Sequence, residues 1–210
     1  MELDKVLFWN VDTQVDFIEP TGKLYAPGAE EIRPILGKIT SYAKDNRIKV
    51  VNTADHHKIT SEELSSHPDY IDSFPQHCMA GSKGAAFVEE TNPDNPLILE
   101  WDKEYVLHED FFDAGKHRNI LIRKDSFDVF EGNPNTENFL SLINPERIFV
   151  YGVTTNVCVD YAVVGLAERG YEVFVIEDGI KELPNIPLPF DKWTELGVKM
   201  IKFEDIVNYL

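Results

Sequence analysis

Three residues of this 210-residue chain carry side chains that together could cleave an acyl bond. Cys158 supplies a thiol that can attack a carbonyl carbon. Asp12 supplies a carboxylate that can accept the thiol proton, and Lys124 supplies an ammonium that can stabilise a thiolate and a developing oxyanion. Each residue alone also fits an ordinary role, as a buried apolar residue, a turn residue or a surface charge. Their combination predicts nucleophilic catalysis by cysteine.

Cys158 lies in a segment that predicts the start of a helix. With Thr154 or Thr155 as the N-cap, the thiol falls in the first helical turn, where free N–H groups and the helix dipole favour a thiolate. We therefore expect its pKa to lie below the usual value of about 8.5. Two cysteines are too few for a disulfide framework, so their roles are separate. The second cysteine, Cys78, lies beside His77 and is interpreted as structural.

A second group of residues has the chemistry of a metal site. Asp55 and His57 lie close together, and His77 lies in the polar segment 73–87. One carboxylate with two imidazoles suits a divalent transition metal and leaves positions free for water or substrate. Histidines that cluster in a polar loop are also common on exposed surfaces, so both interpretations stay open at this point.

The elements that must position these residues alternate along the chain. Short apolar runs predict strands at residues 6–11, 48–53, 120–123, 148–153 and 172–176, with a weaker one at 199–203. Helices are expected at 30–44, 135–143, 155–169 and 190–196. Strands without polar alternation indicate a sheet covered on both faces. The pattern predicts an α/β three-layer sandwich with a central, mostly parallel sheet of about six strands and helices on both faces.

The candidate residues follow the strands of this predicted sheet. Asp12 follows the first strand, Asp55 and His57 the second, Lys124 the third, and Cys158 comes shortly after the fourth. Ligands of open parallel sheets bind beyond the carboxyl ends of the strands. The sequence therefore predicts one site at this edge of the sheet.

Length, composition and charge limit the class of protein. The 210 residues suit a single domain, 1–210, in which the long region of about 55–118 is expected to carry metal and substrate contacts. A net charge of -17 disfavours nucleic acid and anionic membranes as partners. The chain has neither a long apolar run nor a basic-then-apolar start, so we expect a cytoplasmic protein, with homo-oligomers possible.

Three motifs resemble the isochorismatase-like cysteine hydrolases, also called nicotinamidase-related amidohydrolases. They are Val-Asp-Thr-Gln-Val-Asp-Phe at 11–17, the lysine after the third strand, and Gly-Val-Thr-Thr-Asn-Val-Cys-Val at 152–159. The resemblance implies that Asp12 is the proton acceptor, Lys124 the polarising cation and Cys158 the nucleophile. It also implies an oxyanion hole from the backbone N–H groups of Thr154 and Cys158, and a cis peptide bond between Val153 and Thr154.

The metal-site candidates resemble those of nicotinamidases within that family. There, an Asp-x-His after the second strand joins the histidine of a Pro-x-His-Cys motif. Asp55, His57 and His77 occupy those positions, and Glu63 is the best placed candidate for a further ligand. The resemblance implies a divalent ion such as Zn, Fe or Mn.

These features predict hydrolysis of nicotinamide to nicotinic acid and ammonia through a cysteine thioester. Phe17 and Phe74 are expected to contact the ring of this small carboxamide substrate. The segment after Lys124 lacks the Tyr-Ser-Ala-Phe type of sequence common in relatives, so another amide or ureido hydrolase with the same triad is the first alternative.

Two alternatives belong to other classes. A phosphatase or phosphotransferase would also use an acid after the first strand and a divalent metal. However, Asp12 and Asp16 lie four positions apart rather than two, and that chemistry leaves Cys158 without a role. A non-catalytic small-molecule-binding module is the other, since a fold can persist after activity is lost.

Overall fold

The computed structural model describes residues 3–108, 110 and 117–210, and its centre is one parallel sheet. The strand order is β3-β4-β2-β1-β5-β6-β7. All six neighbouring pairs are parallel. The strands are β1 (Val6–Val11), β2 (Lys49–Asp55), β3 (Leu97–Leu99), β4 (Asn119–Lys124), β5 (Arg147–Val153), β6 (Glu172–Lys181) and β7 (Lys199–Ile201).

The predicted three-layer architecture is confirmed, but the prediction of about six strands was wrong by one. The strand that sequence patterns missed is β3, which has three residues and pairs with β4 at the edge of the sheet. A run this short carries too few apolar residues to stand out from the surrounding loop.

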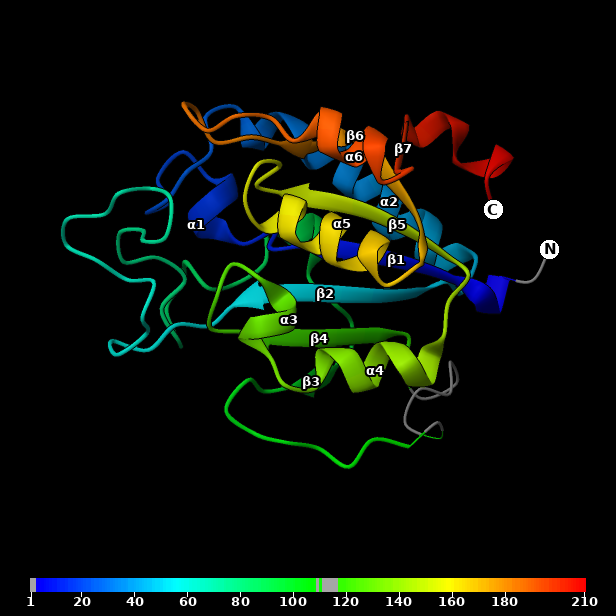
Figure 1. Ribbon diagram of the computed structural model, residues 1–210, viewed down its shortest axis with the longest axis horizontal. Coiled ribbons are helices and arrows are strands. Elements are labelled where there is room, and N and C mark those ends of the chain that lie inside the picture. Colours follow the sequence, from blue (N-terminus) through cyan, green and yellow to red (C-terminus); the bar gives the residue numbers. More distant parts are fainter. Residues whose placement is uncertain (1–2, 109, 111–116) are drawn as a thin grey trace.

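Helices cover both faces of the sheet. In Figure 1, α3, α4 and α5 lie in front of the strands and α2 lies behind them. The α-helices are α1 (Val15–Ile18), α2 (Arg33–Asp45), α3 (Val129–Gly132), α4 (Thr136–Ile143), α5 (Cys158–Glu168) and α6 (Phe190–Glu195). Short 3-10 helices are η1 (Leu3–Lys5), η2 (Ala29–Ile32), η3 (Glu89–Thr91) and η5 (Phe203–Asn208).

Apolar packing on both faces explains the continuous hydrophobic runs of the central strands. Every residue of β1 is buried, and Leu7, Phe8 and Trp9 have no exposed surface. Burial of one large apolar side chain stabilises the fold by about 1.5–3 kcal/mol. The strand that carries Asp12 is therefore among the most firmly anchored parts of the molecule.

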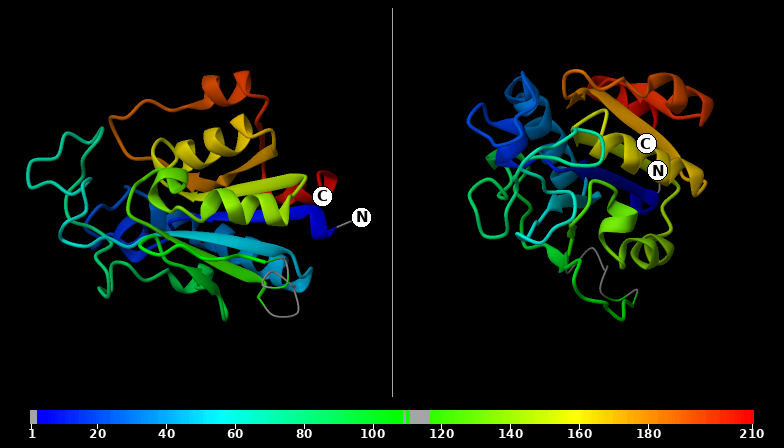
Figure 2. Two further views of the ribbon diagram at one scale, coloured as in Figure 1. Left: turned by 60° about the horizontal axis from the view of Figure 1, so that its bottom comes forward. Right: turned by 60° about the vertical axis from the view of Figure 1, so that its left-hand side comes forward.

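The carboxyl ends of the strands point away from both chain termini, toward a long loop (Figures 1 and 2). Two side chains that follow β1 hold this loop in place through hydrogen bonds. Gln14 Nε2 donates to the carbonyls of Asp55 and Ala85 at 2.8 and 2.9 Å. Asp16 accepts from the backbone N–H of Cys78 at 2.7 Å. Of the predicted loop region 55–118, residues 109 and 111–116 lie outside the described residues.

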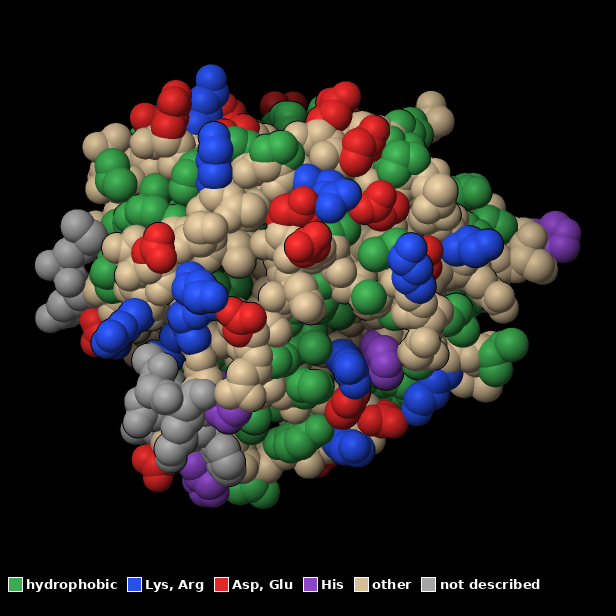
Figure 3. Space-filling view, turned by 180° about the vertical axis from the view of Figure 1, so that it is seen from behind, with side chains coloured by type: hydrophobic (Ala, Val, Ile, Leu, Met, Phe, Trp, Pro, Cys, Tyr) green, Lys and Arg blue, Asp and Glu red, His purple; other side chains and the backbone are tan. Residues whose placement is uncertain are grey.

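Charged side chains of both signs are mixed on the surface. On the face shown in Figure 3, Lys and Arg lie scattered among Asp and Glu rather than in one continuous basic area. Within the described part of the chain, the helices are too short or too polar to cross a bilayer.

Candidate active site

Strand register brings three of the predicted residues together. Asp55 and Lys124 end neighbouring strands and are register partners in the β2–β4 pair. Val11 is the register partner of Thr53 in the β1–β2 pair, so Asp12 comes one position before the level of Asp55 and leaves the strand with a φ of 46°. Side chains on neighbouring parallel strands at one level lie next to each other. The sheet thus places Asp55 beside Lys124, and the turn at Asp12 brings its carboxylate to the same ammonium.

Lys124 is the centre of this cluster and is 1% exposed. Its Nζ lies 2.9 Å from Asp12 Oδ2, forms a second ion pair with Asp55 Oδ1, and donates to the Ser126 carbonyl at 3.1 Å. It also donates to Cys158 Sγ at 3.8 Å. Burial lowers the pKa of Lys124, but Asp12 and Asp55 outweigh it and hold that pKa well above its usual value. The ammonium therefore stays charged.

The two carboxylates have pKa values shifted in opposite directions. Burial raises the pKa of Asp12, and Lys124 opposes this only in part. Burial also raises the pKa of Asp55, but Lys124 and the contacts with His57 and His77 outweigh burial and hold that pKa well below the usual value. A pair of acids whose environments separate their pKa values is typical of acid–base sites. Asp12 is the better proton acceptor of the two.

Asp12 is also oriented toward the thiol. Its Oδ1 accepts a hydrogen bond of 2.6 Å from Thr53 Oγ1, and a carboxylate oxygen of Asp12 lies within 4.8 Å of Cys158 Sγ. This arrangement holds Oδ1 in place and leaves Oδ2 beside Lys124.

Cys158 is the first residue of α5, but two predictions about it were wrong. The N-cap is Val157, without a side-chain cap, because the chain is still turning at Thr154 and Thr155: the Thr155 N–H pairs with the Lys181 carbonyl of β6. The pKa of Cys158 is raised rather than lowered, because burial outweighs the attraction of Lys124. The resting group is a thiol that needs a base.

The backbone before α5 fits the predicted oxyanion hole. The Val153–Thr154 peptide bond is cis, as the resemblance implied. Thr155 and Val157 donate their N–H groups to backbone carbonyls, whereas within the described residues no such bond is found for Thr154 or Cys158. Gly152 is required here, since a Cβ at this position would lie 2.0 Å from the Val11 carbonyl oxygen.

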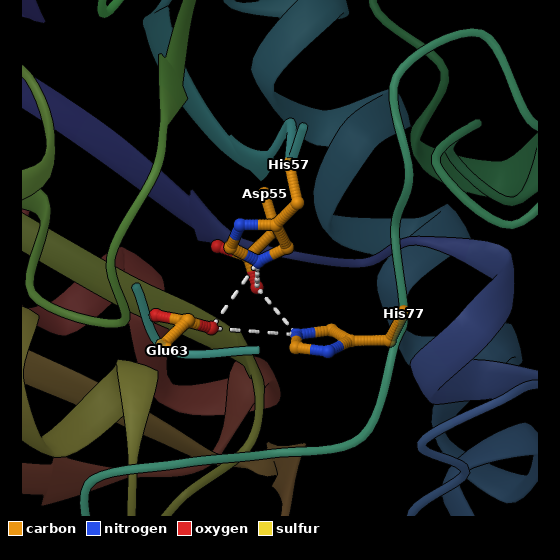
Figure 4. A group of neighbouring side chains, drawn as sticks. All are labelled: Asp55, His57, Glu63 and His77. Carbon is orange, nitrogen blue, oxygen red and sulfur yellow. Dashed lines mark hydrogen bonds and ion pairs between the residues drawn. The ribbon is translucent and has the colours of Figure 1, made fainter. Parts of the chain in front are cut away.

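Four further side chains converge beside the triad, as Figure 4 shows. His57 Nε2 lies 3.2 Å from Glu63 Oε1 and 3.7 Å from Asp55 Oδ2. His77 Nε2 lies 3.3 Å from Asp55 Oδ2 and 3.6 Å from Glu63 Oε1. All four residues are buried, and one ligand atom of each lies within 4.8 Å of the others. The predicted ligands, including Glu63, therefore surround one point.

The set fits a divalent transition metal. His57 Nε2 is buried and accepts or donates no hydrogen bond within the described residues, although it faces two carboxylates. Burial lowers the pKa of His57, but the hydrogen bond with Asp125 and the nearby carboxylates of Asp55 and Glu63 raise it to about 11. A cation is the natural partner for such concentrated negative charge. Carboxylate and imidazole donors suit Zn, Fe or Mn.

Asp55 joins the two groups, a connection that the sequence did not predict. Its Oδ1 contacts Lys124, and its Oδ2 faces His57 and His77. The sequence also gave no role to Gln14, although it lies inside the first motif. Its side chain holds both backbone groups of Asp55, since it donates to the carbonyl and accepts from the N–H at 2.8 Å.

A small apolar cavity adjoins the thiol and the metal-ligand set. Phe17 and Phe74 line it, with ring centroids 5.3 and 6.3 Å from that of His77. Phe127, which sequence patterns did not single out, forms a third aromatic wall 6.2 Å from Phe74. The cavity has about 10 Å³ of free space. A groove of about 1490 Å³ lies outside it, and the two share Leu24, Val157 and Leu183.

The chain is similar in sequence and in fold to several known proteins. The nicotinamidase of Escherichia coli K12 is 24% identical over 188 residues, which cover 81% of this chain and 80% of that protein. Among solved structures, the N-carbamoylsarcosine amidase of Thermoplasma acidophilum has a TM-score of 0.71 at 19% identity and covers 94% of this chain and 95% of its own. The zinc complex of Pyrococcus horikoshii pyrazinamidase has a TM-score of 0.70 at 22% identity, with coverages of 95% and 99%.

A family comparison covers most of the chain. The model of the isochorismatase domain matches residues 6–185, which include both groups of candidate residues. The chain therefore belongs to the isochorismatase family.

Proposed function

We propose that this protein is a nicotinamidase that hydrolyses nicotinamide to nicotinic acid and ammonia. One observation carries the proposal: a cysteine with a base and a cation shares a small aromatic-walled cavity with a buried metal-ligand set, and Asp55 belongs to both. A substrate that carries an amide group on a ring with a metal-ligating nitrogen would fit the cysteine and the metal-ligand set at the same time.

The acylation step starts from the protonated thiol. Asp12 accepts the Cys158 proton as Sγ attacks the carboxamide carbon, and the carbonyl π electrons move to oxygen. Lys124 and the N–H groups of Thr154 and Cys158 stabilise this oxyanion. When the oxyanion collapses, the C–N bond breaks and Asp12 returns the proton to the nitrogen. Ammonia leaves, and the acyl group remains on Cys158 as a thioester.

The deacylation step uses the same groups. Asp12 accepts a proton from a water molecule whose oxygen attacks the thioester carbon. Lys124 stabilises the second oxyanion, and the C–S bond breaks as that oxyanion collapses. Cys158 regains its proton from Asp12, and nicotinic acid is released. The raised pKa of Asp12 supports this role, since a base is more effective when its pKa approaches the working pH.

Asp55, His57, Glu63 and His77 are the residues that would hold a divalent ion. When bound, such an ion supplies a Lewis acid for the pyridine nitrogen. Two similar proteins support this proposal: the Escherichia coli protein is a nicotinamidase, and the Pyrococcus horikoshii protein is a pyrazinamidase in complex with zinc. Contacts from Phe17, Phe74 and Phe127 would flank the ring.

Ammonia release from nicotinamide by metal-loaded protein tests the proposal. Replacement of Cys158 by Ala should reduce turnover by about 10⁴-fold or more, because the nucleophile is lost. Cys78→Ala is the matched control and should stay active, since the Cys78 thiol donates to the Gly84 carbonyl at 3.8 Å and its backbone N–H is retained.

Two outcomes would contradict the proposal. Turnover retained by Cys158→Ala would exclude the thioester mechanism. No turnover of nicotinamide, together with hydrolysis of a linear N-carbamoyl amino acid, would favour the alternative of a ureido hydrolase with the same triad.

A further inference from the structure

Asp125, the residue directly after Lys124, contacts the metal-ligand set from outside. Its Oδ1 lies 3.0 Å from His57 Nδ1 and also accepts a short hydrogen bond from Ser61 Oγ. The His57 side chain is completely buried, whereas the Asp125 carboxylate is 19% exposed. Asp125 therefore lies between His57 and the surface.

This contact decides which nitrogen of His57 can bind a metal. A carboxylate oxygen can only accept, so a neutral His57 that faces Asp125 carries its hydrogen on Nδ1. Its Nε2 then presents a lone pair, and this is the buried atom that faces Asp55 and Glu63 without a hydrogen bond. Histidine ligands of metals are commonly oriented in this way by an outer carboxylate.

The same short segment holds two further ligands. Lys124 contacts Asp55, and the backbone N–H of Phe127 donates to Glu63 Oε2 at 2.8 Å, which leaves Oε1 toward the histidines. His77 has its own outer partner, because Nδ1 lies 2.7 Å from the Pro75 carbonyl. Three of the four candidate ligands are thus oriented by residues 124–127.

We propose that Asp125 is a positioning residue of the metal site, which keeps the hydrogen of His57 on Nδ1 and directs Nε2 toward the ion. The inference rests on the proposed metal site and adds the residue that orients His57 before the ion binds. It also gives a role to the segment after Lys124, which lacks the Tyr-Ser-Ala-Phe type of sequence common in relatives: the residues of this segment orient metal ligands.

A purely structural role for Asp125 is the competing explanation. Ser61 Oγ donates to Asp125 and accepts from the Lys58 N–H at 2.8 Å, so Asp125 also tethers the start of the loop. Ser61→Ala removes this tether and leaves the Asp125–His57 contact in place. Asp125→Ala removes both, whereas Asp125→Asn keeps an acceptor oxygen for Nδ1 without the charge.

The test is the affinity of the metal-depleted full-length protein for Zn²⁺, measured by competition with a chromophoric chelator. Asp125→Ala should weaken binding by about 10- to 100-fold, the range for loss of an outer partner of a metal ligand. The Zn²⁺ affinity of Asp125→Asn should lie between that of Asp125→Ala and that of the unchanged protein. The affinity of Ser61→Ala should stay close to that of the unchanged protein. Asp128→Asn is the matched control, because Asn caps α3 as well as Asp does.

Failure of the inference is distinguishable from failure of the metal site. Zn²⁺ binding that is absent, or unaffected by His57→Ala, would overturn the metal site. If His57→Ala abolishes binding but Asp125→Ala binds like Asp128→Asn, Asp125 has no positioning role. Equal weakening by Ser61→Ala and Asp125→Ala would assign the effect to the loop tether and overturn the inference as well.

A second readout covers the case in which Asp125→Ala does not fold. In ¹⁵N NMR spectra of the zinc-loaded protein, His57 should carry its hydrogen on Nδ1, and Asp125→Asn should retain this tautomer. A hydrogen on Nε2 in the zinc-loaded protein would overturn the inference.

Discussion

The two halves of the candidate site are built in different ways. Asp12 and Lys124 lie at the ends of central strands, where pairing with neighbouring strands fixes their positions. His57, Glu63 and His77 lie in the loop after β2, where the described regular pairing is limited to isolated bridges such as His57 with Met79. The strand-borne half is held by the sheet, and the loop-borne half by hydrogen bonds between polar groups.

This difference predicts how each half responds when a charge is removed from it. Removal of a charge from the sheet half leaves buried groups that cannot move apart, because the strands hold them. Removal of charge compensation from the loop half allows its polar side chains to rearrange, because the pairing described for this loop is limited to isolated bridges, although Phe74 packs in the core. Three experiments of decreasing expected effect examine the contrast.

Replacement of Lys124 by Met should have the largest effect on stability. It leaves Asp12 and Asp55 buried without their shared cation, and loss of one partner of a buried ion pair costs about 3–5 kcal/mol. Urea unfolding of metal-free protein measures the change. The matched control is Lys44→Met, whose exposed pair with Asp94 should contribute no more than about 1 kcal/mol.

A second substitution sharpens this result. Addition of Asp12→Asn to Lys124→Met should recover part of the lost stability without activity, because one of the two buried charges is removed. Equal destabilisation by Lys124→Met and Lys44→Met would show that the strand-end cluster is not held rigidly.

Metal removal should have the next largest effect, and it should be local. An ion present at 100 times its dissociation constant stabilises the folded state by about 2.7 kcal/mol. After chelation, amide hydrogen exchange should rise most in residues 56–80, and in β1 and β5 by no more than the loss of global stability allows. An equal rise in residues 56–80 and in the central strands would contradict the division of the site into two separately held halves.

The smallest effect is expected from protonation of Asp69, at the tip of the loop after β2. Hydrogen bonds from the backbone N–H of Ile71 and from the side chain and N–H of Ser73 lower the pKa of Asp69 from 3.8 to about 2. A lowered pKa means that the contribution of Asp69 is fully present above about pH 3.8 and is lost as the pH falls through about 2. The amide NMR signals of Ile71 and Ser73 should titrate with this midpoint.

A matched variant checks that assignment. Asp69→Asn should abolish the transition near pH 2, whereas Asp72→Asn should leave it in place. Persistence of the same midpoint in Asp69→Asn would mean that another group controls the loop tip.

Sequence patterns predicted the sheet because its strands are apolar on both faces, as β1 shows. They placed the start of α5 too early, since 155–169 was expected and Cys158–Glu168 is found. The helical propensity of a segment does not reveal that Thr155 is already paired with Lys181 of a distant strand. The single helix expected at 30–44 is divided into η2 and α2 for a similar reason, because Pro34 follows the first turn.

Within the site, residue types were predictable and their environments were not. Asp12, Lys124 and Cys158 stand in recognisable motifs, and the structure brings them together. The direction of the Cys158 pKa depends on burial by residues far apart in the chain, which local helix geometry cannot reveal. The contact of Asp125 with His57 joins positions 68 residues apart and has no local signal.

The small cavity beside Cys158 has a kinetic consequence. Its free space of about 10 Å³ corresponds to about one water molecule, far less than an aromatic amide occupies. Binding of such a ring must therefore wait until wall residues such as Leu24 and Leu183, which separate the cavity from the groove, have moved. The rate of complex formation then levels off as amide concentration rises, because motion of the wall limits it and such motions typically take microseconds to milliseconds.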